Sequence, residues 1–371
     1  MKYFMLLSLF PVLWMFISKA IWRSNISWKE SVLQIAILLV AIGILVAGGY
    51  ICSLADTQLI NGEVTSKDRQ EVLCSHSYQC RCYTSCSGFG KNRSCSQHCS
   101  TCYYHSYDVD WNVRSNVGNL TIDRLSSQGL EEPPRWSSIK KGDPFTKTVL
   151  YDNYIKASSD TLFKVSKENI KFFINKIPQY PKVYDYYKVN RILPVGVDMH
   201  DLQNMNEYLS QKLKVLGPLK QANIIVVVVN EPDQAYRFAL EAAWEGGKQN
   251  DVIVILGTPH YPDISWVDTI TLGGNKGNEL LQVKMRNDIM DEPVVSIHTL
   301  DIITDEVSKH FDREPMEHFK YLLDSISPPD WLIGFAAFLS VTASLGLTWF
   351  FYCFDIKTGL WARPINPFKK N

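Results

Sequence analysis

Three long runs of uncharged, mostly apolar residues constrain this chain more than any other feature of its sequence. They cover residues 3–18, 31–55 and 331–354, and the second and third runs hold 25 and 24 residues. Because a helix rises about 1.5 Å per residue, about 20 apolar residues cross the roughly 30 Å hydrocarbon core of a bilayer. The second and third runs are therefore predicted to be transmembrane helices, so the lipid bilayer is the first expected partner.

The first run, YFMLLSLFPVLWMFIS, has two interpretations. It is short, Pro11 interrupts it, and the ISKA at its end is compatible with cleavage of a signal peptide. Against cleavage, Lys2 is the only positive charge before the run, and the bulky Trp14 lies close to the cleavage position. We favour a short membrane helix that extends to Trp22, with Lys19 reaching the interface.

Basic residues flank these helices on one side. The loop between the first two runs has three basic residues and one acid, and the tail after Phe354 has four basic residues and one acid. The basic residues are Lys19, Arg23, Lys29, Lys357, Arg363, Lys369 and Lys370. Cytoplasmic loops carry an excess of Lys and Arg. The sequence therefore predicts a multi-pass protein of the cell membrane, with its C-terminus in the cytoplasm and residues 56–330 on the opposite side.

Seven of the nine cysteines are clustered between Cys74 and Cys102. Outside the cytoplasm, clustered cysteines usually form disulfides. We therefore expect disulfides among six of them, with the pairing left open because spacing does not sort it. The six are Cys80, Cys82, Cys86, Cys95, Cys99 and Cys102. Cys74 stands apart from this compact group and is the candidate for a free or intermolecular thiol.

Two alternatives remain open for these cysteines. The same six could bind zinc as thiolates, with His76, His98 or His105 nearby, although neither half of the cluster has paired C-x2-C knuckles. A reactive redox loop is the third interpretation. No cofactor is favoured by the sequence, and zinc or another divalent cation is the alternative. Cys52 and Cys353, inside apolar runs, are expected to be small apolar fillers.

The segment that follows the cysteines is typical of a small β-rich module. Residues 107–114 alternate between apolar and polar side chains, which predicts a half-buried strand, and residues 120–122 continue the alternation as a second strand. The stretch YPKVYDYYKVNRIL, rich in Tyr and Val, is predicted to be one further strand.

Helical and strand patterns alternate from Asp198 onward. Apolar residues at helical spacing predict a helix over 198–216 that ends at Gly217-Pro218. NIIVVVVN and VIVILGT are runs of branched residues typical of strands covered on both faces, and ISWVDTITLG is a third strand. Residues 300–326 are expected to complete the domain as one long or two short helices. Strands that alternate with helices predict a layered α/β sandwich.

The predicted fold class is therefore α/β plus transmembrane α, with three membrane helices. We expect two N-terminal membrane helices joined by a short basic loop, a Cys-rich and β-rich module, an α/β domain, and a C-terminal membrane helix with a basic tail. In that order these segments cover residues 1–55, 56–190, 191–327 and 328–371.

The α/β region resembles a known family. Its first helix, the strand IIVVVVNE and the stretch FALEAAWEGGKQNDVIVILG are similar to the TPM domain of extracytoplasmic proteins tethered by membrane helices. The resemblance covers residues 197–326. It implies a TPM-like sandwich, and either acid phosphatase activity or a role in the assembly and maintenance of membrane complexes. The whole layout also resembles integral membrane proteins of large tailed bacteriophages, which implies a location in the host inner membrane.

Candidate catalytic residues are few. The chain has no G-x-S-x-G, H-E-x-x-H or Walker-type loop. Asp198, Asp251 and Asp268 fall near loop ends of the predicted α/β layers, where ligands tend to bind. A divalent cation held by two of these carboxylates would suit phosphoryl chemistry. Helix caps and solvated acids explain the same residues equally well.

Small residues four apart in the apolar runs indicate where membrane helices pack. Gly43 and Ala47 have this spacing in the second run, and Ala336, Ser340 and Ser344 have it in the third. Such faces let helices approach closely. They serve packing within one chain or the formation of an oligomer.

The overall charge excludes one class of partner. Lys plus Arg and Asp plus Glu both total 38, so no positive excess points to nucleic acid. Our first hypothesis is a non-enzymatic membrane protein that presents a disulfide-braced extracytoplasmic domain to an envelope or membrane protein. A membrane-tethered, metal-dependent phosphatase or other hydrolase is the alternative, and a zinc-binding module is the second alternative.

Overall fold

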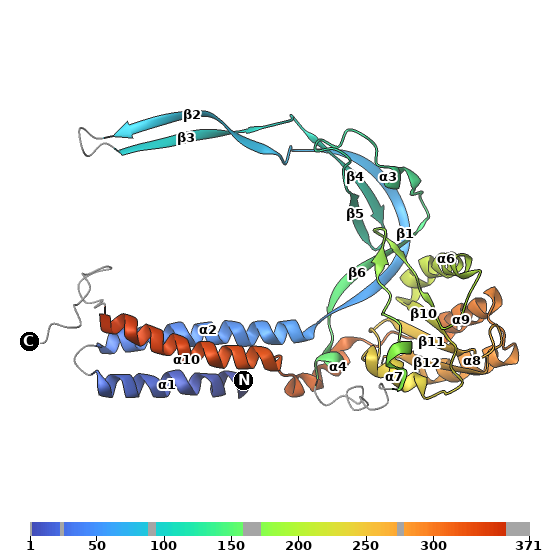
Figure 1. Ribbon diagram of the computed structural model, residues 1–371. Coiled ribbons are helices and arrows are strands. Elements are labelled where there is room, and N and C mark those ends of the chain that lie inside the picture. The colour runs from blue at the N-terminus through green and yellow to red at the C-terminus, as the bar shows by residue number, and fades with distance from the viewer. Residues whose placement is uncertain (1, 23–25, 88–93, 159–171, 273–277, 354–371) are drawn as a thin grey trace, which may run out of the picture. The chain divides into compact units, whose positions relative to one another are not determined.

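The computed structural model describes the chain except residues 1, 23–25, 88–93, 159–171, 273–277 and 354–371 (Figure 1). The chain forms two compact units. The first unit comprises residues 1–56, 151–162 and 316–371, and the second comprises residues 57–150 and 163–315. The basic tail used to predict the orientation lies outside the described residues.

The first unit contains three helices that are long and apolar enough to cross a membrane: α1 (Lys2–Ile21), α2 (Trp28–Leu54) and α10 (Asp330–Cys353). This confirms the predicted membrane helices. α1 continues through Pro11, because membrane helices accommodate a proline when neighbouring groups satisfy the freed carbonyl. α2 begins with a capping box, in which the Ser27 side chain accepts from the Glu30 backbone N–H and the Glu30 carboxylate accepts from the Ser27 N–H.

Small and polar side chains bring these three helices side by side (Figure 1). Ala336, Ser340, Ser344 and Thr348 recur every four residues along α10 and are buried. The Ser340 hydroxyl donates to the Leu7 carbonyl oxygen of α1, at 3.3 Å. Polar contacts of this kind join helices in an apolar environment, where a hydrophobic driving force between them is absent.

The face of α2 that packs on the other two helices is not centred on Gly43 and Ala47. Ala47 is exposed and Gly43 is half-buried, whereas Leu38, Ile42 and Val46 face the other helices. Adjacent residues on a helix point about 100° apart, so a shift of one position moves the contact to another face. The Gln34 amide, on the same buried face, donates to the Ser344 carbonyl oxygen at 2.9 Å and to the Thr348 hydroxyl at 3.0 Å.

The second unit contains a four-stranded antiparallel β-sheet in the order β5-β4-β1-β6. Its strands are β1 (Ala55–Val72), β4 (Asp108–Ser115), β5 (Gly118–Ile122) and β6 (Pro144–Asp152). β4 and β5 confirm the strands predicted from alternation, and Val109, Trp111 and Val113 point into the core of this sheet. The long β1 was not predicted, because its mixed charges hide any period of two.

A second sheet has the order β12-β11-β10-β9, with β12 antiparallel to its neighbour. Its strands are β9 (Ile192–Val195), β10 (Asn223–Val229), β11 (Asp251–Gly257) and β12 (Trp266–Thr271). Every residue of β10 and β11 is buried. This confirms the prediction that the two branched runs are strands covered on both faces.

Helices cover both faces of this second sheet. Ile224, Val226 and Val228 of β10 pack in a core with α6 (Leu202–Lys220), α8 (Asn278–Asp291) and α9 (Ile297–His310). Ile225 and Val227 point the opposite way and pack with α7 (Tyr236–Ala243). The alternation follows from the two-residue period of a strand.

The other helices of the described residues are short. They are α3 (Pro134–Ser138), α4 (Tyr154–Ala157) and the 3-10 helices η3 (Ile174–Lys176) and η4 (Met316–Ser325).

Two sequence-based boundaries were wrong. The stretch predicted as one strand is divided into β7 (Val183–Tyr184), β8 (Lys188–Val189) and β9, because Asp185 and Tyr186 adopt φ angles of 45° and 72° in a tight turn. α6 continues through Gly217-Pro218 to Lys220. Pro218 lies in the last turn, where its missing N–H removes a single hydrogen bond.

Candidate functional site

The clustered cysteines form a β-hairpin rather than a loop. Its strands are β2 (Ser77–Ser87) and β3 (Ser94–Tyr103), which pair antiparallel with a bulge between Cys80 and Tyr83. Among the described residues, three disulfides cross it: Cys80–Cys102, Cys82–Cys99 and Cys86–Cys95. The pairing is nested, as the two legs of a hairpin require. The structure thus supports the prediction that these six cysteines form disulfides. Their sulfur atoms are therefore not available as thiolate ligands for zinc.

The described part of the hairpin has no core of its own. Almost every side chain of β2 and β3 is exposed, including Tyr83 at 65% and Tyr103 at 58%. An isolated two-stranded hairpin is only marginally stable in water. A disulfide restricts the unfolded chain and contributes about 2–4 kcal/mol. The three cross-links therefore hold a shape that packing alone would not hold.

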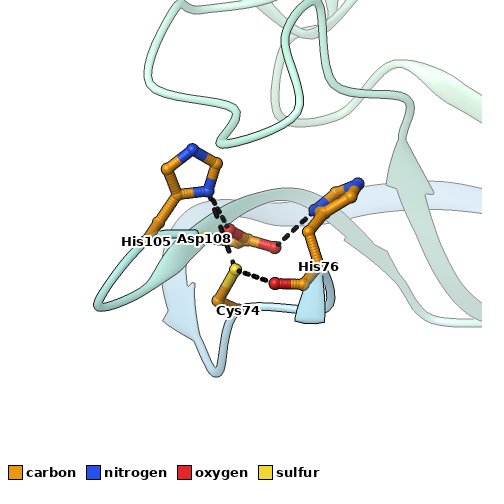
Figure 2. Close-up of side chains that lie close together, drawn as sticks. All are labelled: Cys74, His76, His105 and Asp108. Atoms are coloured by element: carbon orange, nitrogen blue, oxygen red, sulfur yellow. Dashed lines mark hydrogen bonds and ion pairs between the residues drawn. The ribbon is translucent and has the colours of Figure 1, made fainter. Parts of the chain in front are cut away.

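Four further side chains converge at the base of the hairpin: Cys74, His76, His105 and Asp108 (Figure 2). Cys74 follows the end of β1, and His76 immediately precedes β2. His105 follows β3, and Asp108 is the first residue of β4. Each residue thus lies next to the end of a different strand, so the cluster joins both legs of the hairpin to the sheet.

The distances within this cluster are short. The Cys74 Sγ lies 3.6 Å from the His105 Nδ1, which in turn lies 3.3 Å from the Asp108 Oδ1. The His76 Nδ1 lies 3.7 Å from the Asp108 Oδ2. One potential ligand atom from each of the four residues lies within 4.8 Å of the others. Cys74 and Asp108 are buried, whereas the His76 side chain is 47% exposed.

The Asp108 carboxylate is held by groups outside the cluster. Its Oδ2 accepts from the Ser75 backbone N–H at 2.9 Å, from the Ser75 hydroxyl at 3.0 Å and from the Arg124 Nη1 at 2.7 Å. The Ser75 N–H and then the Arg124 guanidinium hold the pKa of Asp108 well below its usual range, against the opposing effect of burial. Asp108 is therefore an anion, and its Oδ1 faces His105.

The sequence pointed to some of these residues and not to others. His76 and His105 were considered as zinc ligands, but together with cysteines that are in fact disulfide-bonded. His98 lies elsewhere on the hairpin, with its ring stacked on Tyr83 at 5.6 Å. Asp108 was taken for the polar face of a strand, because nothing in the linear pattern separates it from its neighbours.

The three candidate catalytic carboxylates do not converge. Asp251 pairs with Asn223 at one end of β10, whereas β9, which precedes Asp198, ends beside Val229 at the other end. The residues between these ends of β10 span about 20 Å at 3.3 Å per residue. Burial raises the pKa of Asp251, whose carboxylate accepts hydrogen bonds from Asn223 and Tyr180. The positions of these carboxylates give no support to a shared metal site for phosphoryl transfer.

Asp268 forms an ion pair with Arg237. It lies in β12 opposite Ile255, and its carboxylate lies 3.3 Å from the Arg237 Nε of α7. Asp268 therefore connects a strand to the helix that covers it.

A pocket of about 630 Å³ borders α6 and the first sheet, with the buried Arg191 in its lining. The Arg191 guanidinium donates to oxygen atoms of Asn61, Thr146, Ser210 and Asn223, all of which are neutral. Burial lowers the pKa of Arg191 to about 10. The partners belong to β1, β6, α6 and β10, so this cation joins the two sheets of the unit.

Comparisons of the chain with protein-family models, with curated proteins and with solved structures find no match. The resemblance to the TPM domain and to bacteriophage membrane proteins stays a prediction.

Proposed function

We propose that this protein is a membrane-anchored display module, which holds the disulfide-braced hairpin outside the cytoplasm so that it binds another membrane or envelope protein. The observation that carries this proposal is the hairpin itself. Three disulfides stiffen a ribbon whose described side chains are almost all exposed. A ribbon without a core adds little to the stability of the rest of the chain, so its rigidity serves contacts with another molecule.

The surface of the hairpin suits protein recognition. Four tyrosines on or beside it are exposed, and serine is the commonest residue around them. The tyrosines are Tyr78, Tyr83, Tyr103 and Tyr104. Antibody paratopes use the same combination, in which tyrosine supplies rigid contact area and serine supplies adaptable hydrogen bonds. Cross-linking the hairpin in advance lowers the conformational entropy lost on binding.

The charge of the hairpin indicates the kind of partner. Residues 72–107 contain no Asp or Glu, whereas they contain Arg81, Lys91 and Arg93. Complementary potentials steer association and select among partners. We therefore expect an acidic protein surface as the partner, and the assembly or modulation of an envelope complex as the outcome.

Two observations support a location outside the cytoplasm. Disulfides form and persist in oxidising compartments and are rare in the cytosol. The excess of Lys and Arg on the flanks of the apolar runs supports an orientation with those flanks in the cytoplasm and the hairpin on the other side.

Site-specific photocrosslinking in intact cells tests the proposal. A photoreactive residue at Tyr83 should form a discrete adduct with one membrane or envelope protein, and the double variant Cys82→Ser/Cys99→Ser should lose most of it. The matched control is the same residue at Phe238, which is 49% exposed on α7. If both positions yield the same set of adducts, or if the adduct at Tyr83 persists without the Cys82–Cys99 disulfide, the proposal is wrong.

A further inference from the structure

We infer that Cys74, His76, His105 and Asp108 bind a single Zn²⁺ ion. This site is independent of the proposed display function, because it concerns the base of the hairpin and not its exposed surface. The interatomic distances, the chemistry of the ligands and the outer hydrogen bonds all support it.

Two distances within the cluster match edges of a tetrahedral zinc centre. With Zn–S near 2.3 Å and Zn–N or Zn–O near 2.0–2.1 Å, tetrahedral angles place sulfur about 3.5 Å from nitrogen, and nitrogen about 3.3 Å from oxygen. The corresponding distances are 3.6 Å from Cys74 to His105 and 3.3 Å from His105 to Asp108. All four ligand atoms lie within 4.8 Å of one another, so an ion would draw the widest pair together by at most roughly 1.5 Å.

The set of donor atoms selects zinc. One thiolate, two imidazole nitrogens and one carboxylate oxygen are all common zinc ligands. Ca²⁺ and Mg²⁺ prefer shells made of oxygen, and Mg²⁺ retains several waters. A buried sulfur and two imidazoles therefore disfavour both of these ions. With four protein ligands the site is closed, which is typical of structural zinc and not of catalytic zinc.

The groups around Asp108 have the arrangement that a metal ligand needs. Ser75 and Arg124 hold its Oδ2, which lies 3.7 Å from the His76 Nδ1, and the Oδ1 faces His105. Hydrogen bonds of this kind orient ligands and strengthen metal binding. The partly exposed His76 and His105 rings, at 47% and 25%, give the ion a path from solvent.

A nucleophilic Cys-His-Asp triad does not fit the same atoms. A triad histidine uses one ring nitrogen for the nucleophile and the other for the carboxylate. Here the Cys74 Sγ and the Asp108 Oδ1 both approach the same ring nitrogen of His105, its Nδ1 (Figure 2). Because both contacts involve the same nitrogen, they do not form a proton relay, which needs both ring nitrogens. The same arrangement suits an ion bound between the three side chains.

The zinc site also accounts for the odd number of clustered cysteines. Six are used in the three disulfides, and Cys74 is free and buried. A thiolate bound to zinc is protected from pairing with another cysteine in an oxidising compartment. Because the four ligands lie beside the ends of β1, β2, β3 and β4, one ion would fasten the hairpin to its sheet.

Metal analysis of the full-length protein, purified in detergent without a histidine tag, tests this inference. We expect one zinc ion per chain by inductively coupled plasma mass spectrometry. Replacement by Co²⁺ should give the visible absorption of a tetrahedral ion and a thiolate-to-cobalt band in the near ultraviolet. Cys74→Ser should remove the thiolate band, and His76→Ala should weaken zinc binding by at least roughly tenfold.

Matched controls separate loss of zinc from loss of folding. Cys52→Ser removes a free cysteine in α2, and His98→Ala removes a hairpin histidine outside the cluster, so both variants should keep one zinc. The three disulfides, mapped by non-reducing mass spectrometry, should be intact in His76→Ala, because about half of the His76 side chain is exposed. A wild-type protein with intact disulfides that binds neither zinc nor Co²⁺, or that holds a different metal, would overturn the inference whatever the crosslinking result.

Discussion

Replacing Gly217 by alanine sets two effects of opposite sign against each other in α6. In an ordinary helix this change stabilises by up to about 1 kcal/mol, because glycine has the greater conformational freedom to lose. At this position, however, an added Cβ would lie 2.3 Å from the Asn61 carbonyl oxygen and 2.7 Å from the Asn61 Cβ of β1. Atoms in ordinary contact lie about 3.5–4.0 Å apart, so α6 and β1 would have to separate by more than roughly 1 Å.

The expected net effect is a clear loss of stability. Overpacking of this size costs about 1–3 kcal/mol. A shift of β1 would also disturb the Asn61 amide, which donates to the Ala222 carbonyl oxygen and to the Asn223 side chain, at about 1 kcal/mol for each bond lost. After subtraction of the gain in helix propensity, Gly217→Ala should lower the free energy of unfolding by about 2–4 kcal/mol.

Native-state hydrogen exchange of the β10 amides in the full-length protein measures this change, because buried strands exchange only through extensive unfolding. Leu219→Ala is the control in the same helix. Its side chain is 72% exposed, so the expected change is within about 0.5 kcal/mol. An equal or greater stability of Gly217→Ala would refute the close approach of α6 to β1.

Three further substitutions test other parts of the chain. Arg191→Met should lower the free energy of unfolding by about 2–4 kcal/mol in the same exchange assay, because the buried oxygen atoms of Asn61 and Thr146 lose their donor. A loss below about 1 kcal/mol would contradict the proposal that Arg191 joins the two sheets. Gln34→Leu removes the hydrogen bond from α2 to Thr348 of α10 and should lower the free energy of unfolding in SDS by about 1 kcal/mol. An unchanged free energy of unfolding would contradict a stabilising role for this hydrogen bond. The Arg114 hydrogen bond lowers the pKa of Asp68 in the folded protein. This exposed pair therefore stabilises the fold at pH values above the pKa that Asp68 has in the unfolded chain, and the stabilisation is lost as the pH falls through the folded pKa. Arg114→Gln should therefore lower the Tm slightly at pH 7, and this difference should vanish near about pH 2.

The membrane helices and the α/β strands were accessible from the sequence because their signals are local. A run without charge needs only its own length to indicate a span, and β10 needs only its branched residues to indicate burial on both faces. The hairpin was harder to predict, because exposed strands have no apolar alternation. Its signal lay in the order of the cysteines, whose spacing in the second half, Cys95 to Cys102, roughly mirrors that in the first, Cys80 to Cys86. That spacing is compatible with nested pairing but leaves other pairings open, and the register of β2 with β3 decides between them.

The cluster at the base of the hairpin could not be derived in the same way. Cys74 and His76 are about 30 residues from His105 and Asp108, and only the pairing of β1 with β4 and of β2 with β3 brings the two pairs together. Gly217 is a related case. The sequence suggests a helix end, whereas the structure shows that β1 passes too close for any side chain.

By itself, therefore, the sequence determined that the chain contains three helices able to cross a membrane, a cysteine-rich segment suited to disulfides, and strands buried between helices. Each of these depends on composition within one short stretch. The sequence also predicted that Cys74 stays outside the disulfides, which the structure confirms. Tertiary structure alone decided how the other six clustered cysteines pair, which histidines meet Asp108 and which carboxylates stay apart. Those outcomes depend on strand register and on contacts between distant segments, and neither is written in any local pattern of residues.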